Sequence, residues 1–113
     1  MRQTTARKHA ALLQAVAHPT RLQILEKLAG GRTCVSELQS LVDVPQPNVS
    51  QHLAQLRKAG LVVCHKRGTV RCYHLAKPQL IRDLLAVLGR SYPEVAPVEL
   101  ETCGGAKRSG RKR

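Results

Sequence analysis

Small polar side chains gather in one short stretch of the sequence, where they have the chemistry to read the edges of DNA bases. The stretch contains Gln46, Asn48, Ser50, Gln51 and His52. Gln and Asn can form paired hydrogen bonds with adenine in the major groove, and Ser can bond to several bases. His52 can contact a base or a phosphate, with packing inside the protein as an equal alternative. These residues together predict a surface that reads double-stranded DNA. The alternative is an ordinary solvated helix face without a binding function.

Apolar residues in the same stretch predict the element that carries this surface. Val49, Leu53 and Leu56 recur at i, i+4 and i+7, which is the spacing of one buried helix face. Pro47 suits the first helical position, and the pattern continues to Ala59. The polar side chains then face outward, and the N-terminal part of the helix is the part that enters a major groove.

Basic residues follow the helix in a segment with the alternation of β-strands. Residues 61–75 predict a β-hairpin whose turn, at 66–68, is itself basic. Lys66, Arg67 and Arg71 are expected to lie along the flanking DNA backbone. They supply charge there rather than base recognition.

Two short helices separated by a tight connection precede this hairpin. Apolar spacing predicts the first over about 34–42, with Thr33 as its N-cap, and the second is the helix that starts at Pro47. Further helices are expected over about 5–16 and 19–29. Two short helices joined in this way form a helix-turn-helix. The predicted fold is therefore mainly α with a β-hairpin wing, a winged helix-turn-helix.

A last helix is predicted from Pro78 onward, and its apolar face is wider than one small domain can cover. A partner chain would cover it. Residues 1–92 are expected to form a single DNA-binding and dimerisation domain. Residues 93–113 contain prolines, glycines and a run of basic residues, and are expected to form a flexible basic tail.

The chain as a whole is strongly basic, with 19 Lys and Arg against 7 Asp and Glu and a formal charge of +12. This charge favours a polyanionic partner. Two Tyr are its only aromatic residues, which argues against stacking on single strands, so duplex DNA is the expected partner. No run of 18 apolar residues and no signal-peptide pattern is present, so we expect a cytoplasmic protein without membrane contact. The alternative from another class is a constitutive architectural protein that binds DNA through charge alone.

Four widely spaced cysteines complete the set of reactive residues. They are Cys34, Cys64, Cys72 and Cys103. No Cys-x-x-Cys is present, so neither a disulfide framework nor a zinc finger is indicated, and the cysteines are expected to act as thiols. A cysteine nucleophile needs a positioned base, and the sequence brings none convincingly close, so we do not expect an enzyme.

Cys34 is the best candidate for a reactive thiol. It lies at the start of a predicted helix beside Arg32, where the helix dipole and the cation both favour the thiolate. The alternative is a small buried apolar residue.

The length of the hairpin turn decides whether Cys64 and Cys72 point to the same face of the sheet. With a two-residue turn at Arg67-Gly68, Cys64 and Cys72 point to opposite faces, and with a three-residue turn they face each other. In the second case the wing could hold a soft metal or metalloid, with His65 or His74 as a further ligand.

Over about residues 9–91 the chain resembles the ArsR/SmtB family of bacterial winged-helix repressors, and three segments carry the resemblance. They are AHPTRLQIL (17–25), CVSEL (34–38) and PNVSQHLAQLRKAGLV (47–62). The resemblance implies a homodimer built through the first and last helices. It also implies binding to an operator with two-fold symmetry, and repression until an inducer favours the low-affinity conformation.

The sensor types known in this family narrow the choice of inducer. Its arsenic sensors carry Cys-Val-Cys where this chain has Cys34-Val35-Ser36, and its zinc sensors carry Asp-x-His in the last helix, where this chain has Asp83 and no His. The remaining resemblance is to members that sense reactive sulfur or oxidants through thiols, with no required cofactor. It implies Cys34 and Cys103 as the sensor pair. The alternative is a soft-metal or metalloid sensor using Cys34, Cys64, Cys72 or Cys103.

Overall fold

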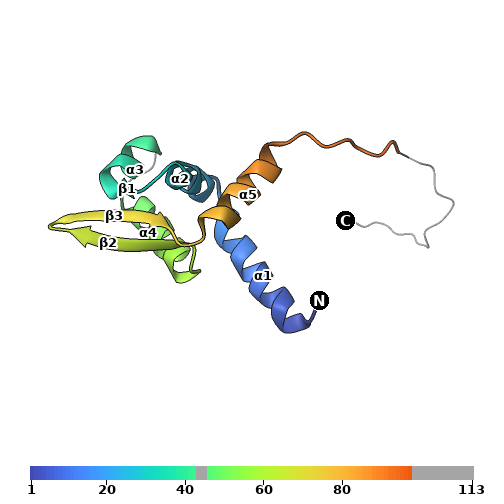
Figure 1. The fold of residues 1–113 in the computed structure, drawn as a ribbon, viewed down its shortest axis with the longest axis horizontal. Coiled ribbons are helices and arrows are strands. Elements are labelled where there is room, and N and C mark those ends of the chain that lie inside the picture. The colour runs from blue at the N-terminus through green and yellow to red at the C-terminus, as the bar shows by residue number, and fades with distance from the viewer. Residues whose placement is uncertain (43–45, 98–113) are drawn as a thin grey trace.

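Five helices and a three-stranded antiparallel sheet make up the computed structural model, which describes residues 1–42 and 46–97 (Figure 1). In chain order the elements are α1 (Gln3–Val16), α2 (Pro19–Ala29), β1 (Thr33–Cys34), α3 (Val35–Leu41), α4 (Gln46–Lys58), β2 (Val62–Arg67), β3 (Val70–Leu75) and α5 (Pro78–Gly89). The strands lie in the order β1-β3-β2. The predicted winged helix-turn-helix is confirmed: α3 and α4 form the helix pair, and β2 and β3 form the wing.

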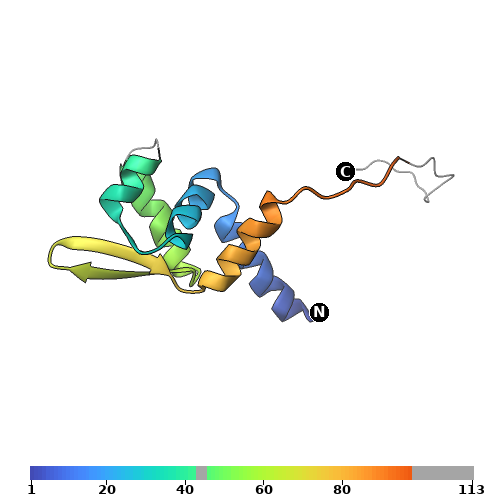
Figure 2. The same ribbon diagram turned by 45° about the horizontal axis from the view of Figure 1, so that its top comes forward.

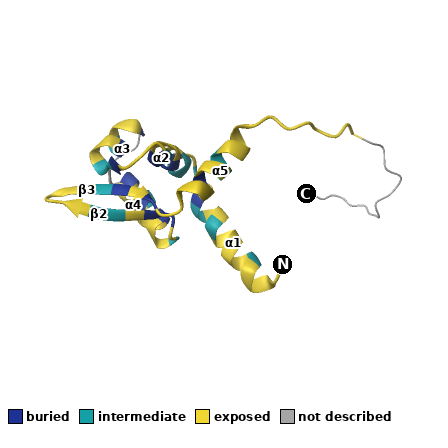
Figure 3. Ribbon diagram, viewed as in Figure 1, coloured by how far each residue is buried: buried dark blue, intermediate teal, exposed yellow. Residues whose placement is uncertain are grey.

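The core lies where the helices pack together and against the base of the hairpin (Figure 3). Ile24, Leu38, Leu53 and Ile81 come from α2, α3, α4 and α5, and each is at most 1% exposed. Burying one such side chain contributes about 1.5–3 kcal/mol. The long helix α1 contributes only Val16 to the buried set, so most of its surface stays exposed.

Three residues explain where α2 begins and ends. His18 has an extended backbone with φ −156°, and its Nδ1 accepts a hydrogen bond from the backbone N–H of Thr20 at 3.1 Å. Pro19 occupies the first turn, where its missing N–H costs nothing. After the helix the chain turns through Gly31 at φ 141°, a conformation that favours glycine.

The prediction that Thr33 caps the third helix is wrong. Thr33 and Cys34 form the short strand β1, in which Thr33 pairs with Tyr73 and Cys34 pairs with Cys72. The Thr33 hydroxyl donates to the carbonyl oxygen of Gly31 at 3.1 Å, and Cys34 is the N-cap residue of α3, without a side-chain cap bond. A strand of two residues has no periodicity of its own, and it forms here because β3 offers an edge to pair with.

The hairpin turn has two residues, Gly68 and Thr69, because Arg67 pairs with Val70. Gly68 has φ 64°, as the first position of such a tight hairpin turn requires. The turn lies one residue later than the Arg67-Gly68 turn considered from the sequence, but it has the same length.

Helices α1 and α5 lie at the end of the molecule away from the tip of the wing (Figures 1 and 2). Apolar residues stay open to solvent there: Leu13 is 54% exposed, Val87 47% and Leu88 60%. Of the predicted tail, residues 98–113 lie outside the part that the structure describes. Within the described ranges, no helix has the length and apolar character needed to cross a membrane.

Candidate nucleic-acid interface

Helix α4 buries one face and exposes the other, as its spacing predicts. Val49 and Leu53 are at most 1% exposed, whereas Asn48, Ser50 and Gln51 lie on the surface. α4 begins at Gln46, one residue earlier than predicted, and the side chain of Gln46 lies outside the described part. Three of the five residues predicted to meet bases are therefore exposed on the second helix of the pair.

His52 differs from its neighbours and does not simply face outward. Its side chain is half-buried, and its Nδ1 accepts a hydrogen bond from Nε of Arg21 at 3.2 Å. Its ring lies 4.3 Å from the ring of His18, measured between centroids. Burial lowers the pKa of His52, and His18 and Arg21 lower it further. These contacts fit the alternative prediction for His52, which is packing inside the protein.

Arg21 makes this cluster a link between three helices. While Nε bonds to His52 of α4, Nη1 donates to the backbone oxygen of Ala15 in α1 at 3.0 Å. Local sequence patterns do not reveal this role of Arg21, because one partner is distant along the chain and the other is a backbone atom. Its place early in α2, just after the His18-Pro19 break, is the one local signal.

The cations of the wing are exposed, and two of them face each other. Lys66 pairs directly with Arg71 across the hairpin, while Arg67 lies nearer the turn. Like charges directly opposite each other destabilise a strand pair. An anion such as a DNA phosphate would relieve this repulsion.

One hollow is lined by residues of both the wing and the helix pair. It has a volume of about 340 Å³ and is lined by residues from α3, α4 and β3, among them Ser36, Ser50 and Arg71. A predicted base-reading residue and a predicted phosphate-contacting residue thus share one surface. The sequence could not establish this, because it does not fix the wing against α4.

The cysteines of the hairpin point to opposite faces of the sheet. Cys64 pairs with Tyr73, whereas Cys72 pairs with His65, one residue away along β2. Burial raises the pKa of Tyr73, and its contact with Cys64 adds to the rise. The wing site that would have used both cysteines together is therefore not formed. Within residues 1–42 and 46–97, no group of three or more His, Cys, Asp or Glu is placed to hold a metal ion.

Cys34 is half-buried at the start of α3. Its Sγ lies 3.2 Å from Oγ of Ser36 and donates to Oε1 of Glu37 at 3.4 Å. The sequence predicts only the cation Arg32 beside this thiol, whereas the structure also places the Glu37 carboxylate against it. Cys103 lies outside the described residues.

Comparison with known proteins agrees with this geometry. The profile of the family described as bacterial regulatory protein, arsR family, matches residues 18–63. The biofilm growth-associated repressor of Agrobacterium fabrum is 39% identical over 78 residues, covering 69% of this chain and 67% of that protein. The transcriptional activator HlyU of Vibrio cholerae is 38% identical over 85 residues, covering 75% of this chain and 78% of HlyU.

Solved structures share the fold. A structure of HlyU from Vibrio cholerae has a TM-score of 0.69 at 37% identity, and the match covers 79% of this chain and 98% of that one. The homodimeric winged helix-turn-helix DNA-binding domain of Mb0332 from Mycobacterium bovis also has a TM-score of 0.69, at 27% identity, covering 75% of this chain and 82% of that one. Sequence, fold and exposed helix face agree, and the chain belongs to the ArsR family of bacterial regulatory proteins, winged helix-turn-helix proteins that bind DNA and are not enzymes.

Proposed function

We propose that this protein is a transcriptional repressor that binds a DNA operator with two-fold symmetry as a homodimer. The observation that carries the proposal is the exposed face of α4, where Asn48, Ser50 and Gln51 lie on the surface beside the basic wing. Polar side chains at the start of a recognition helix read base edges, and cations on the wing hold the backbone. Gln46 and His52 belong to the predicted base-reading set, and Lys66, Arg67 and Arg71 to the phosphate-contacting set.

The homodimer is supported by surface that one chain leaves uncovered. A hollow of about 690 Å³ between α1 and the start of α5 is lined mainly by apolar side chains, including Leu12, Leu13 and Leu80. The Mb0332 domain, whose fold is similar, is homodimeric. Two α4 helices related by a two-fold axis then read two half-sites of one operator.

Selection of duplexes from a random pool, followed by fluorescence anisotropy on the selected site, tests this function. The repressor is expected to bind its selected site about 10³-fold or more tighter than random duplex at the same salt concentration. An architectural protein would bind all duplexes alike and yield no consensus. A reporter gene placed behind the selected site tests the direction of control, because one relative is named a repressor and another an activator.

Release from the operator is proposed to follow modification of thiols by an oxidant or reactive sulfur, with Cys34 and Cys103 as the sensor pair. The position of Cys34 supports this, because its Sγ contacts Ser36 and Glu37 in the first turn of α3, which belongs to the helix pair. In the Cys34→Ser variant we expect unchanged affinity of the reduced protein and no loss of affinity on oxidation. Normal release of this variant from DNA would mean that Cys34 is structural.

A further inference from the structure

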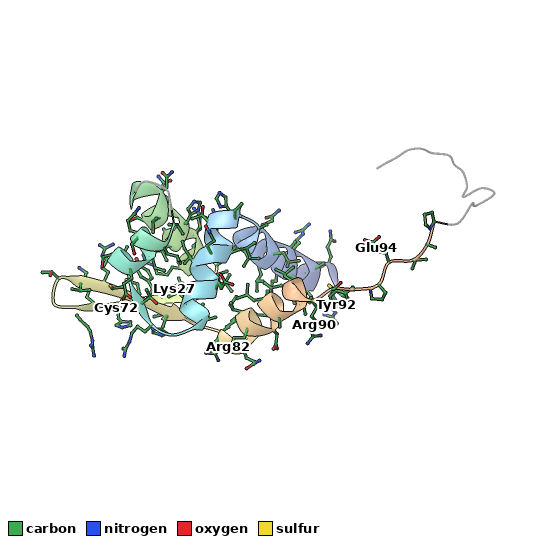
Figure 4. The ribbon with its side chains drawn as sticks, turned by 90° about the horizontal axis from the view of Figure 1, so that it is seen from above. Lys27, Cys72, Arg82, Arg90, Tyr92 and Glu94 are labelled. Carbon is green, nitrogen blue, oxygen red and sulfur yellow. The ribbon has the colours of Figure 1, made fainter. Side chains whose placement is uncertain are left out.

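Cys34 has a second cysteine beside it within the described part of the chain. In the sheet, Cys34 of β1 pairs with Cys72 of β3, and Cys72 pairs on its other side with His65 of β2. Directly paired residues of antiparallel strands place their side chains on the same face. The three side chains therefore form one row across the whole sheet, and Cys72 can be located on the hairpin in Figure 4.

This row lies on the outer face of the sheet. The neighbouring row consists of Thr33, Tyr73 and Cys64, of which Thr33 and Tyr73 are each only 5% exposed. Because successive residues of a strand alternate between faces, the row of Cys34 points away from the core. Cys34 and Cys72 are each half-buried, in contrast to the buried Thr33 and Tyr73 of the neighbouring row.

The pairing brings the two thiols within the range of a disulfide. Opposite residues of an antiparallel pair have Cα atoms about 4.5–5.5 Å apart. A disulfide requires Cα atoms about 4.4–6.8 Å apart, so the strands need not move. Rotation of the side chains is sufficient, although Cys34 must give up its contacts with Ser36 Oγ and Glu37 Oε1.

A base lies at the other end of the row. Nε2 of His65 is buried and has no hydrogen-bond partner among the described residues, and the ring lies 5.2 Å from that of His74. Burial lowers the pKa of His65, as do His74 and the nearby cations Arg32 and Arg67. The lowered pKa favours the neutral imidazole, which has one ring nitrogen that can accept a hydrogen bond, and the strand pairing places this ring beside Cys72.

We propose that Cys34 and Cys72 form an intrachain disulfide when a peroxide oxidises the protein, and that this bond fastens the wing to the first helix of the DNA-binding pair. It keeps the thiol response and the Cys34 of the function proposed above but gives Cys34 a different partner, Cys72 in place of Cys103, and it rests on that function only for its effect on DNA. It does not need the tail that carries Cys103.

The reaction balances with one peroxide. The thiolate of Cys72 attacks one peroxide oxygen, the O–O bond breaks, and the leaving hydroxide takes up a proton to become water. The thiolate of Cys34 then attacks the sulfenic sulfur of Cys72, the S–O bond breaks, and a second hydroxide leaves as water. Two thiols lose two electrons and two protons, and the peroxide is reduced to two waters.

Digestion with trypsin separates the four cysteines, because cleavage after Lys and Arg places each on a different peptide. The reduced full-length protein is treated with one equivalent of hydrogen peroxide, alkylated, digested without reduction and analysed by mass spectrometry. We expect the peptide that starts at Thr33 to be linked to the peptide that starts at Cys72, in the wild type and in Cys103→Ser. Cys64→Ser is the matched control, because Cys64 lies in the same hairpin on the other face, and it should keep the link.

The link must be absent in Cys72→Ser, whose fold is checked by circular dichroism. A link from Cys34 to Cys103 in its place, a link between two chains, or no link at all would overturn the proposal. Operator affinity of oxidised and reduced Cys103→Ser is measured in parallel. We expect a loss of about fivefold or more on oxidation, because Cys34 then gives up its contacts with Ser36 and Glu37 in the first turn of α3. A Cys34–Cys72 link without loss of affinity would uphold the disulfide and refute the proposed release from DNA.

Discussion

Gln51 and His52 are adjacent in α4 but have different surroundings, because successive residues of a helix point about 100° apart. Gln51 lies on the surface away from Val49 and Leu53, whereas His52 is turned toward α2 and bonds to Arg21. Gln51 is therefore the better placed of the two for the predicted contact with a base. The contacts of His52 join α4 to α2.

At this residue scale, Gln51→Ala should weaken operator binding roughly 5- to 150-fold, because a paired contact with a base contributes about 1–3 kcal/mol of discrimination. Binding to random duplex should stay the same. Anisotropy titrations on both duplexes measure the effect, with Gln23→Ala, an exposed glutamine of α2, as the control. Equal losses on both duplexes would place Gln51 away from the base edges.

His52 predicts a dependence of stability on pH. Its pKa is lowered in the folded protein, mainly by burial and then by His18 and Arg21. As the pH falls through about 6.5, His52 binds a proton in the unfolded chain but stays neutral in the folded chain. The free energy of unfolding is therefore highest above this pH and decreases as the pH falls. His52→Gln keeps an acceptor for Arg21 but cannot titrate.

Urea unfolding at pH 7.5 and pH 5.5 checks this dependence. The free energy of unfolding should fall less between these pH values in His52→Gln than in the wild type. The fall should not vanish, since the pKa of His65 is lowered too. The same fall in both proteins would show that His52 is not a source of the pH dependence.

At the scale of elements, the wing carries charge at a cost to its own stability. Lys66 and Arg71 oppose each other directly across the hairpin, and both are exposed. Replacing Lys66 with Gln should therefore stabilise the free protein slightly and weaken DNA binding. The loss should be uniform across sequences, because a phosphate contact carries no base information.

The slope of log affinity against log salt measures this contact. It should become shallower by about 1 in Lys66→Gln. Lys27→Gln removes the same charge from the last turn of α2 instead of the wing, and should leave the slope unchanged. If both variants changed the slope equally, the wing would contribute only to the overall charge.

At the scale of the whole molecule, α1 and α5 carry exposed apolar side chains, among them Leu13, Val87 and Leu88, whereas the polar and basic residues that are predicted to meet DNA lie on α4 and the wing (Figure 1). A dimer formed through α1 and α5 leaves both copies of α4 free. Val87→Lys should therefore shift the protein toward monomer and weaken operator binding. A charge buried in the interface would lack a partner.

Sedimentation equilibrium over a range of concentrations tests this. Val70→Lys is the matched control, because Val70 lies on the wing and is 47% exposed, the same fraction as Val87. It should leave the oligomeric state unchanged. A dimer that survives Val87→Lys but not Val70→Lys would place the interface on the wing instead.

Local patterns in the sequence determined most of the elements. The spacing of Val49, Leu53 and Leu56 predicted α4 and its exposed face, and His18-Pro19 predicted the break before α2. These signals succeed because helix faces, proline and tight turns are governed by contacts within a few residues. The basic charge pointed to DNA in the same way, since net charge needs no fold.

Tertiary structure alone decided the features that join distant segments. The strand β1 exists only because Thr33 and Cys34 find β3, and the bond from Arg21 to His52 exists only because α2 packs against α4. The cysteines show the same limit most clearly: a shift of one residue in the turn length moves a side chain to the other face of the sheet. The two-residue turn places Cys72 and Cys64 on opposite faces of the sheet, and the separate register of β1 against β3 places Cys72 beside Cys34. Both are matters of register between strands, which composition and spacing leave open.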